Sequence, residues 1–196
     1  MAKAREIPGI HGEVPYAVAA ARVVAVRGDE LIDHSRDVLD MGAIERVHDM
    51  RVATRRLRAA LEVFKPCFPK DEYKAALREV KAIADALGER RDRDVTIAAL
   101  EDFATALAAP DRPGIDSLVG SLKGEQARAN EALAGFVDAA RLESLRELLD
   151  ALVESAERVG TEAADTLPEE PAPEPEEDPV AAPLAGGNGA GPLETP

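Results

Sequence analysis

The apolar residues of this chain recur three and four positions apart over most of its length, a spacing that fits α-helices with one buried face. The clearest stripe lies mid-chain and comprises Tyr73, Leu77, Val80, Ala84 and Leu87. Alanine, leucine, glutamate and arginine are abundant and aromatic residues make up only 3%, a composition that favours helix over sheet. We therefore predict an all-α protein.

Proline and glycine divide this pattern into five expected helices. Pro15 suits the first turn of a helix, and Pro66 and Pro69 end the second one. The expected helices span residues 15–36, 43–65, 71–109, 115–139 and 142–164, with breaks at 37–42 and 110–114. Gly88 is a soft point within the long third helix. Because short connections place long helices antiparallel, we expect an antiparallel helical bundle of four to five helices.

Charge and composition indicate three regions. Residues 1–12 have no periodicity and read as a flexible arm, residues 13–165 as the bundle, and residues 166–196 as a disordered acidic tail rich in proline and glycine. The net charge is −14, and the tail holds seven acids and no Lys or Arg, which leaves −7 on residues 1–165. Residues 46–95 nevertheless hold 13 Lys or Arg against 9 Asp or Glu, so the local field there is positive.

Several classes of location and chemistry find no support in the sequence. No apolar run is long enough to cross a bilayer, and the N-terminus lacks an apolar signal region. The single cysteine, Cys67, cannot form an internal disulfide. We therefore expect a cytoplasmic protein that makes no membrane contact and carries no cofactor.

The second expected helix carries an unusual column of cations. On a helical projection, His48, Arg51, Arg55 and Arg58 form a stripe beside the apolar face, whereas Arg56 points elsewhere, towards solvent. No acid lies three or four positions from Arg51 or Arg55, and Arg58 has only Glu62 at that spacing, although like charges three or four positions apart repel. Such a column suits an external anion, and the planar arginine fork can bond two phosphate oxygens at once.

Further cations extend this surface in the sequence. Lys74, Arg78 and Lys81 align at the edge of the apolar stripe of the third helix, and Lys123 and Arg128 of the fourth helix could add to it. From spacing alone, the stronger alternative is that these side chains stay solvated or pair with acids of neighbouring helices.

Arg91 falls on the apolar stripe itself, where the pattern would place Leu. An arginine on a buried face needs a partner. Asp92, Asp94 or a bound anion could provide one, and the sequence leaves these three open.

Two segments resemble the CHAD family, the conserved histidine α-helical domain. The family's helical motif of His, Arg, Val, Arg, Arg, Leu and Arg is matched in register by His48, Arg51, Val52, Arg55, Arg56, Leu57 and Arg58. A second family motif, Leu-Gly followed two residues later by Arg-Asp-x-Asp-Val, is matched by residues 87–95. The resemblance covers about residues 14–164. It implies a helical bundle with a basic cavity or groove that binds inorganic polyphosphate, often at polyphosphate granules.

By motif, the resemblance makes six residues candidates for binding: His48, Arg51, Arg55, Arg56, Arg58 and Arg91. Such domains usually contain two related helical halves, each with its own basic helix, but only one such half is recognisable here. The resemblance therefore leads us to expect a homodimer that restores the missing half. It implies a non-catalytic binder of polyphosphate, and the scarcity of aromatic side chains disfavours single-stranded nucleic acid as the ligand.

There are three alternatives to this interpretation: a metal-binding protein, an enzyme and a scaffold. A metal site would need a ligand cluster, but the three histidines, His11, His34 and His48, lie apart without recognisable ligand spacing. An enzyme would need a nucleophile–base pair, a Walker loop or the alternating Glu-x-Glu-x-Lys signature of the triphosphate-processing domain that accompanies some relatives, and none is evident. A scaffold whose acidic tail recruits basic proteins remains open.

Overall fold

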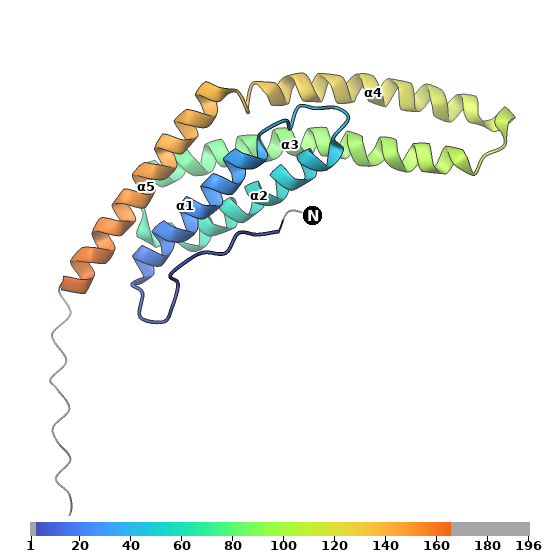
Figure 1. Cartoon of the computed structure of the whole chain (residues 1–196). Coiled ribbons are helices and arrows are strands. Elements are labelled where there is room, and N and C mark those ends of the chain that lie inside the picture. Colours follow the sequence, from blue (N-terminus) through green and yellow to red (C-terminus); the bar gives the residue numbers. More distant parts are fainter. Residues whose placement is uncertain (1–2, 166–196) are drawn as a thin grey trace, which may run out of the picture. The chain divides into compact units, whose positions relative to one another are not determined.

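The computed structural model describes residues 3–165, and its side chains from residue 3 to residue 162. Five α-helices are present there (Figure 1): α1 (Tyr16–His34), α2 (Ile44–Val63), α3 (Lys70–Thr105), α4 (Arg112–Ala134) and α5 (Ala139–Asp165). Two short 3₁₀ turns, η1 (Lys65–Cys67) and η2 (Ala109–Asp111), precede α3 and α4. This part of the chain contains no strand, which confirms the prediction of an all-α antiparallel bundle of four to five helices.

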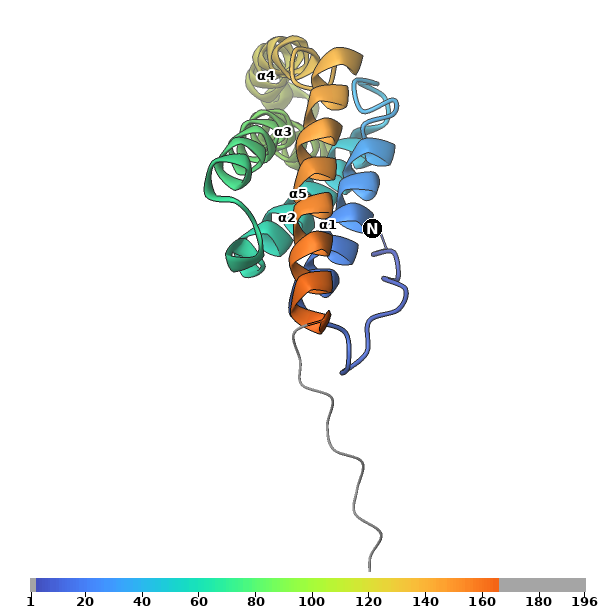
Figure 2. The ribbon, with the colours of Figure 1, turned by 90° about the vertical axis from the view of Figure 1, so that its left-hand side faces the viewer.

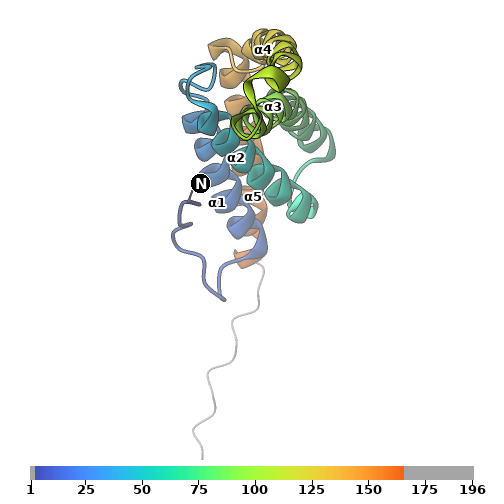
Figure 3. The same cartoon turned by 90° about the vertical axis from the view of Figure 1, so that its right-hand side faces the viewer.

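The helices pack in an order that differs from their order in the sequence. α1 lies between α2 and α5, and α3 packs against α2, α4 and α5. Figures 2 and 3 show α5 beside α1, with α4 running along α3 away from these helices. The main core is built by α1, α2, α5 and the N-terminal half of α3, and Leu133 near the end of α4 also belongs to it.

Small residues allow α1 and α5 to approach closely. Ala17, Ala20 and Ala21 of α1 are buried in the core. A Cβ added to Gly28 would stand 2.9 Å from the Leu149 side chain, and one added to Gly160 would overlap Val18. Both glycines are therefore required by packing rather than by backbone conformation.

The ends of the later helices differ from the predicted ones. Pro113 and Gly114, expected in a turn, lie in the first turn of α4, where the fixed φ of proline is well tolerated. α5 begins at Ala139, three residues earlier than expected. The carboxylate of Asp138 accepts hydrogen bonds from the backbone N–H groups of Ala140 and Arg141, both at 3.1 Å, and so caps this helix.

The segment expected as a loose arm is held against α1. The backbone N–H of Arg5 donates to the buried carboxylate of Glu30 at 2.5 Å, and Arg27 Nη2 donates to the carbonyl of Arg5 at 3.0 Å. Arg22 Nη1 donates to the carbonyl of Gly9 at 2.5 Å. Burial alone would raise the pKa of Glu30, but the hydrogen bonds from Arg5 and Arg27, with the charges of Arg27 and Arg56, bring it below its usual value.

The acidic tail expected at residues 166–196 lies outside the described residues. Between residues 3 and 165, no helix is long and apolar enough to cross a membrane. Cys67 is buried, and burial raises the pKa of its thiol.

Candidate anion-binding groove

The cationic column of α2 faces α3 across a hollow. Arg51, Arg55 and Arg58 line this hollow of about 440 Å³ together with Ala59 and Glu62 of α2 and with Ala84 and Asp85 of α3. The column takes this position because Val47, Met50, Leu57 and Leu61 fix the opposite edge of α2 in the core. Arg51 and Arg58 are seven residues apart, so the column extends over about 10 Å of the helix.

A second hollow continues the first along α3. It has a volume of about 390 Å³ and is lined by Lys74, Leu77, Arg78, Lys81, Ala82 and Asp85. Because Asp85 lines both hollows, they meet at this residue. We call the two hollows together the basic groove, and its cations are Arg51, Arg55, Arg58, Lys74, Arg78 and Lys81.

Most cations of the basic groove have no carboxylate partner. Across residues 3–162, Arg51, Arg55, Arg78 and Lys81 form no ion pair; Arg58 pairs with Glu62 at 3.1 Å, and Lys74 reaches Asp71 only at 3.9 Å. Cations elsewhere in the bundle are commonly paired, for example Arg27 with Glu30 at 2.6 Å and Arg141 with Glu79 at 3.0 Å. Among the described residues, ion pairing between neighbouring helices therefore holds for none of the six groove cations, because the pairs of Arg58 and Lys74 each lie within a single helix.

Gly88 positions Arg51. A Cβ added to this glycine would lie 3.2 Å from Nη1 of Arg51, so the guanidinium group rests against the backbone of α3 at a point that lacks a side chain. α3 continues as a regular helix through Gly88. The glycine expected as a soft point is thus a place of close approach between α3 and a cation of the groove.

Three other candidates of the sequence motifs do not line the groove. His48 is partly buried on α2 and is not among the lining residues of either hollow in the described structure. Arg56, expected to point to solvent, is partly buried and close enough to Glu30 of α1 to lower the pKa of that carboxyl group. Arg91 donates from Nη1 to the carbonyl of Ile44 at 3.4 Å and pairs with Glu45 at 3.8 Å, at the start of α2.

The two candidates on α4 do not line the groove. Lys123 pairs with Glu101 of α3 at 2.7 Å and lines a separate hollow between α3 and α4. Glu101 is 16 residues beyond Asp85, or about 24 Å along the helix axis. The guanidinium group of Arg128 extends along its own helix, with Nη1 3.8 Å from where a Cβ on Gly124 would stand.

The buried arginine of α3 is Arg90, so the assignment of Arg91 to the buried face was wrong. Arg90 is fully buried and forms an ion pair with Asp94, itself 2% exposed. The buried face of α3 passes through Tyr73, Ala76, Val80, Ile83, Leu87, Arg90, Asp94 and Ile97. The predicted stripe shares Tyr73, Val80 and Leu87 with this face. Between these positions it contains Leu77 and Ala84, whereas the buried residues are Ala76 and Ile83. Burial, and secondarily the charge of Arg91, lower the pKa of Arg90, which nevertheless stays charged.

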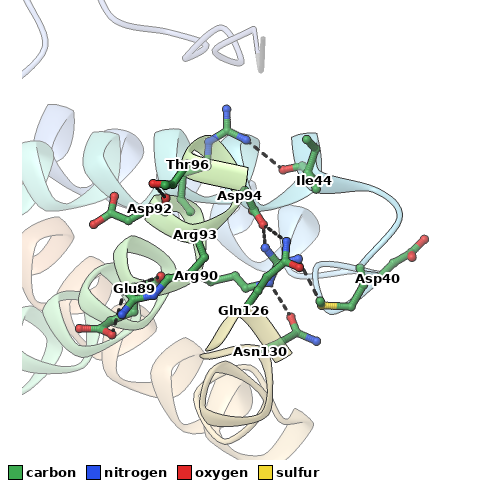
Figure 4. A network of polar contacts seen from close by, with 12 residues as sticks. Asp40, Ile44, Glu89, Arg90, Asp92, Arg93, Asp94, Thr96, Gln126 and Asn130 are labelled. Atoms are coloured by element: carbon green, nitrogen blue, oxygen red, sulfur yellow. Dashed lines mark hydrogen bonds and ion pairs between the residues drawn. The ribbon is translucent and has the colours of Figure 1, made fainter. Parts of the chain in front are cut away.

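Arg90 and Asp94 belong to a polar network that sequence reasoning missed (Figure 4). Arg90 Nε donates to the side-chain oxygen of Asn130 at 3.3 Å, and Gln126 Nε2 donates to the carboxylate of Asp94 at 2.6 Å. Nη2 of Arg90 also donates to the sulfur of Met41 at 3.3 Å. The network therefore joins α3 and α4 to the loop between α1 and α2. Because Arg90 and Asp94 bond to other protein side chains, we assign the network a structural role.

Comparison with known proteins agrees with the two sequence motifs. The model of the CHAD domain family matches residues 22–182, a range that includes both motifs and continues 17 residues past the expected end of the bundle. The chain therefore belongs to the CHAD family. No curated protein and no solved structure matches it.

The described part of the chain offers no evident metal site. There, no group of three or more His, Cys, Asp or Glu side chains is placed to hold a metal ion. The groove offers guanidinium and ammonium donors instead, which are suited to anionic oxygens.

Proposed function

We propose that this protein is a non-catalytic binding module for inorganic polyphosphate and that the basic groove is its binding site. The observation that carries the proposal is the clustering of Arg51, Arg55, Arg78 and Lys81 in one groove without ion-pair partners among the described residues. Membership of the CHAD family, which is associated with polyphosphate binding, supports the same ligand.

The groove suits a linear polyanion better than a single phosphate. Its cations lie along two helices, so one chain of phosphates can contact several of them at once. Binding of that kind releases counterions, and the affinity falls with salt by about 0.7 logarithmic units per contact for a single-stranded polyanion. Four to six contacts would give a slope of about −3 to −4 in a plot of log affinity against log salt.

The test measures binding of long-chain polyphosphate by calorimetry over a range of salt concentrations. Arg51→Gln/Arg55→Gln removes two unpaired cations of the groove, and Arg146→Gln/Arg158→Gln on α5 removes the same charge elsewhere. We expect the groove variant to bind at least about tenfold more weakly and with a shallower salt slope by about 1.4, whereas the control should behave as the wild type.

Competition and product analysis separate this function from the alternatives. RNA and heparin should compete poorly, and the chain length of the bound polyphosphate should stay unchanged during incubation, because we propose no catalysis. If the folded wild-type protein fails to bind polyphosphate, or if both double variants lose binding equally, the groove is not a polyphosphate site.

The assembly and the cellular place belong to the same proposal. Two copies would together provide the two basic helices that the CHAD resemblance leads us to expect. A polyphosphate binder would gather where polyphosphate accumulates, so a fluorescent fusion should mark polyphosphate granules and the Arg51→Gln/Arg55→Gln variant should not.

A further inference from the structure

An acid stands at the centre of the basic groove. Asp85 lines both hollows, with Arg51, Arg55 and Arg58 around the first and Arg78 and Lys81 around the second. It lies one helical turn after Lys81 and three residues before Gly88, against which Arg51 rests. Within the described residues, the exposed carboxylate of Asp85 forms no ion pair, although cations lie on both sides of it.

This position makes Asp85 a barrier between two cationic regions. A compact anion can reach cations of both helices only by lying where the two hollows meet, which is next to the carboxylate. A like charge at contact distance in water weakens binding by about fivefold. A long flexible chain instead places several phosphates in each hollow, and only one phosphate lies next to Asp85. The same repulsion therefore offsets a smaller fraction of its free energy of binding.

We infer that Asp85 is a specificity-determining residue that makes the groove discriminate against compact phosphates in favour of chains long enough to occupy both hollows. The inference rests on the proposed function and adds to it a reason for chain-length selection. It predicts that neutralising Asp85 improves the binding of short phosphates more than that of long ones.

The experiment compares tripolyphosphate with long-chain polyphosphate, each titrated into the full chain at low salt. Asp85→Asn removes the charge in the groove. Asp102→Asn is the matched control, because it makes the same change on an exposed site of the same helix, 17 residues or about 25 Å away. Asn and Asp have similar helix propensities, so both variants should keep the wild-type helical content by circular dichroism.

We expect Asp85→Asn to bind tripolyphosphate about fivefold more tightly and long-chain polyphosphate no more than about twofold more tightly. The preference for the long chain, measured as the ratio of the two affinities, should therefore decrease. Asp102→Asn should change neither affinity. An unchanged ratio of the two affinities in Asp85→Asn, or weaker binding of both ligands, overturns the selective role of Asp85 while leaving the proposed function intact. A wild-type protein that binds neither ligand overturns both.

Discussion

Replacing Gly88 by alanine should stabilise the fold and weaken the binding site at the same time. Gly88 lies inside α3, where glycine costs about 0.8–1.0 kcal/mol relative to alanine because it loses more backbone freedom on folding. Among the described residues, the only close neighbour of the added Cβ is the Arg51 guanidinium group at 3.2 Å, the mobile end of a flexible side chain. That group can move by a few tenths of an ångström, so we expect most of the stabilisation to be retained.

The expected magnitudes follow from these two effects. The free energy of unfolding should rise by about 0.5–1 kcal/mol, which for a chain of this size corresponds to an increase in Tm of roughly 1–4 °C. Polyphosphate affinity should fall by a smaller factor than in Arg51→Gln, because the added methyl group shifts the Arg51 guanidinium away from its position against α3. Gly88→Leu, with a larger side chain, should approach the loss produced by Arg51→Gln, including a decrease of about 0.7 in the salt slope.

Urea unfolding and calorimetric titration measure the two quantities separately. A double-mutant cycle tests the mechanism: in an Arg51→Gln background, Gly88→Ala should stabilise the fold by the same amount but should weaken binding no further. If Gly88→Ala destabilises the protein, the approach of Arg51 to α3 is not as described. If it weakens binding equally with and without Arg51, the glycine does not act through that residue.

Three further predictions concern the buried ion pair, the carboxyl group of Glu30 and the oligomeric state. Arg90→Met leaves the buried carboxylate of Asp94 without its cation and should lower the free energy of unfolding by about 3–5 kcal/mol, whereas Arg90→Met/Asp94→Leu should regain most of that stability. If urea unfolding shows the same loss of stability for the single and the double variant, the buried ion pair is not as described. Because the pKa of Glu30 is lowered in the folded state, its contribution to stability is present above its unfolded pKa of about 4.3 and is lost as pH falls through the lower folded value. Arg27→Gln should therefore lower the free energy of unfolding at neutral pH and make it decrease less steeply as the pH falls. If the free energy of unfolding, measured in urea between about pH 6 and 3, follows the wild-type curve, Arg27 does not stabilise the charged form of Glu30. Sedimentation at increasing protein concentration should show a dimer, and a species that stays monomeric at the highest concentration would exclude the proposed pairing of two chains.

Much of the local structure could be predicted from the sequence. Apolar spacing and proline positions gave all five helices to within a few residues, because helix ends depend on nearby residues. The placement of Arg51, Arg55 and Arg58 on one edge of α2 also followed from helical geometry, since positions three and four apart share a face. The role of Gly88 was missed, although its place in the second CHAD motif was visible, because its neighbour Arg51 is 37 residues away in the sequence.

The sequence by itself determined which residues share a helix face, and the tertiary structure decided which faces meet. Both possible stripes of α3 contain Tyr73, Val80 and Leu87, and both are apolar in between, so periodicity left Arg90 and Arg91 as equal continuations. Only the approach of α4, which brings Gln126 and Asn130 to one side of α3, selects Arg90 for burial. The tertiary structure also decides whether a cation forms an ion pair, because the two charged groups must lie within a few ångströms of each other. Helical spacing is a property of one segment of chain, whereas burial and pairing are properties of the contacts between segments.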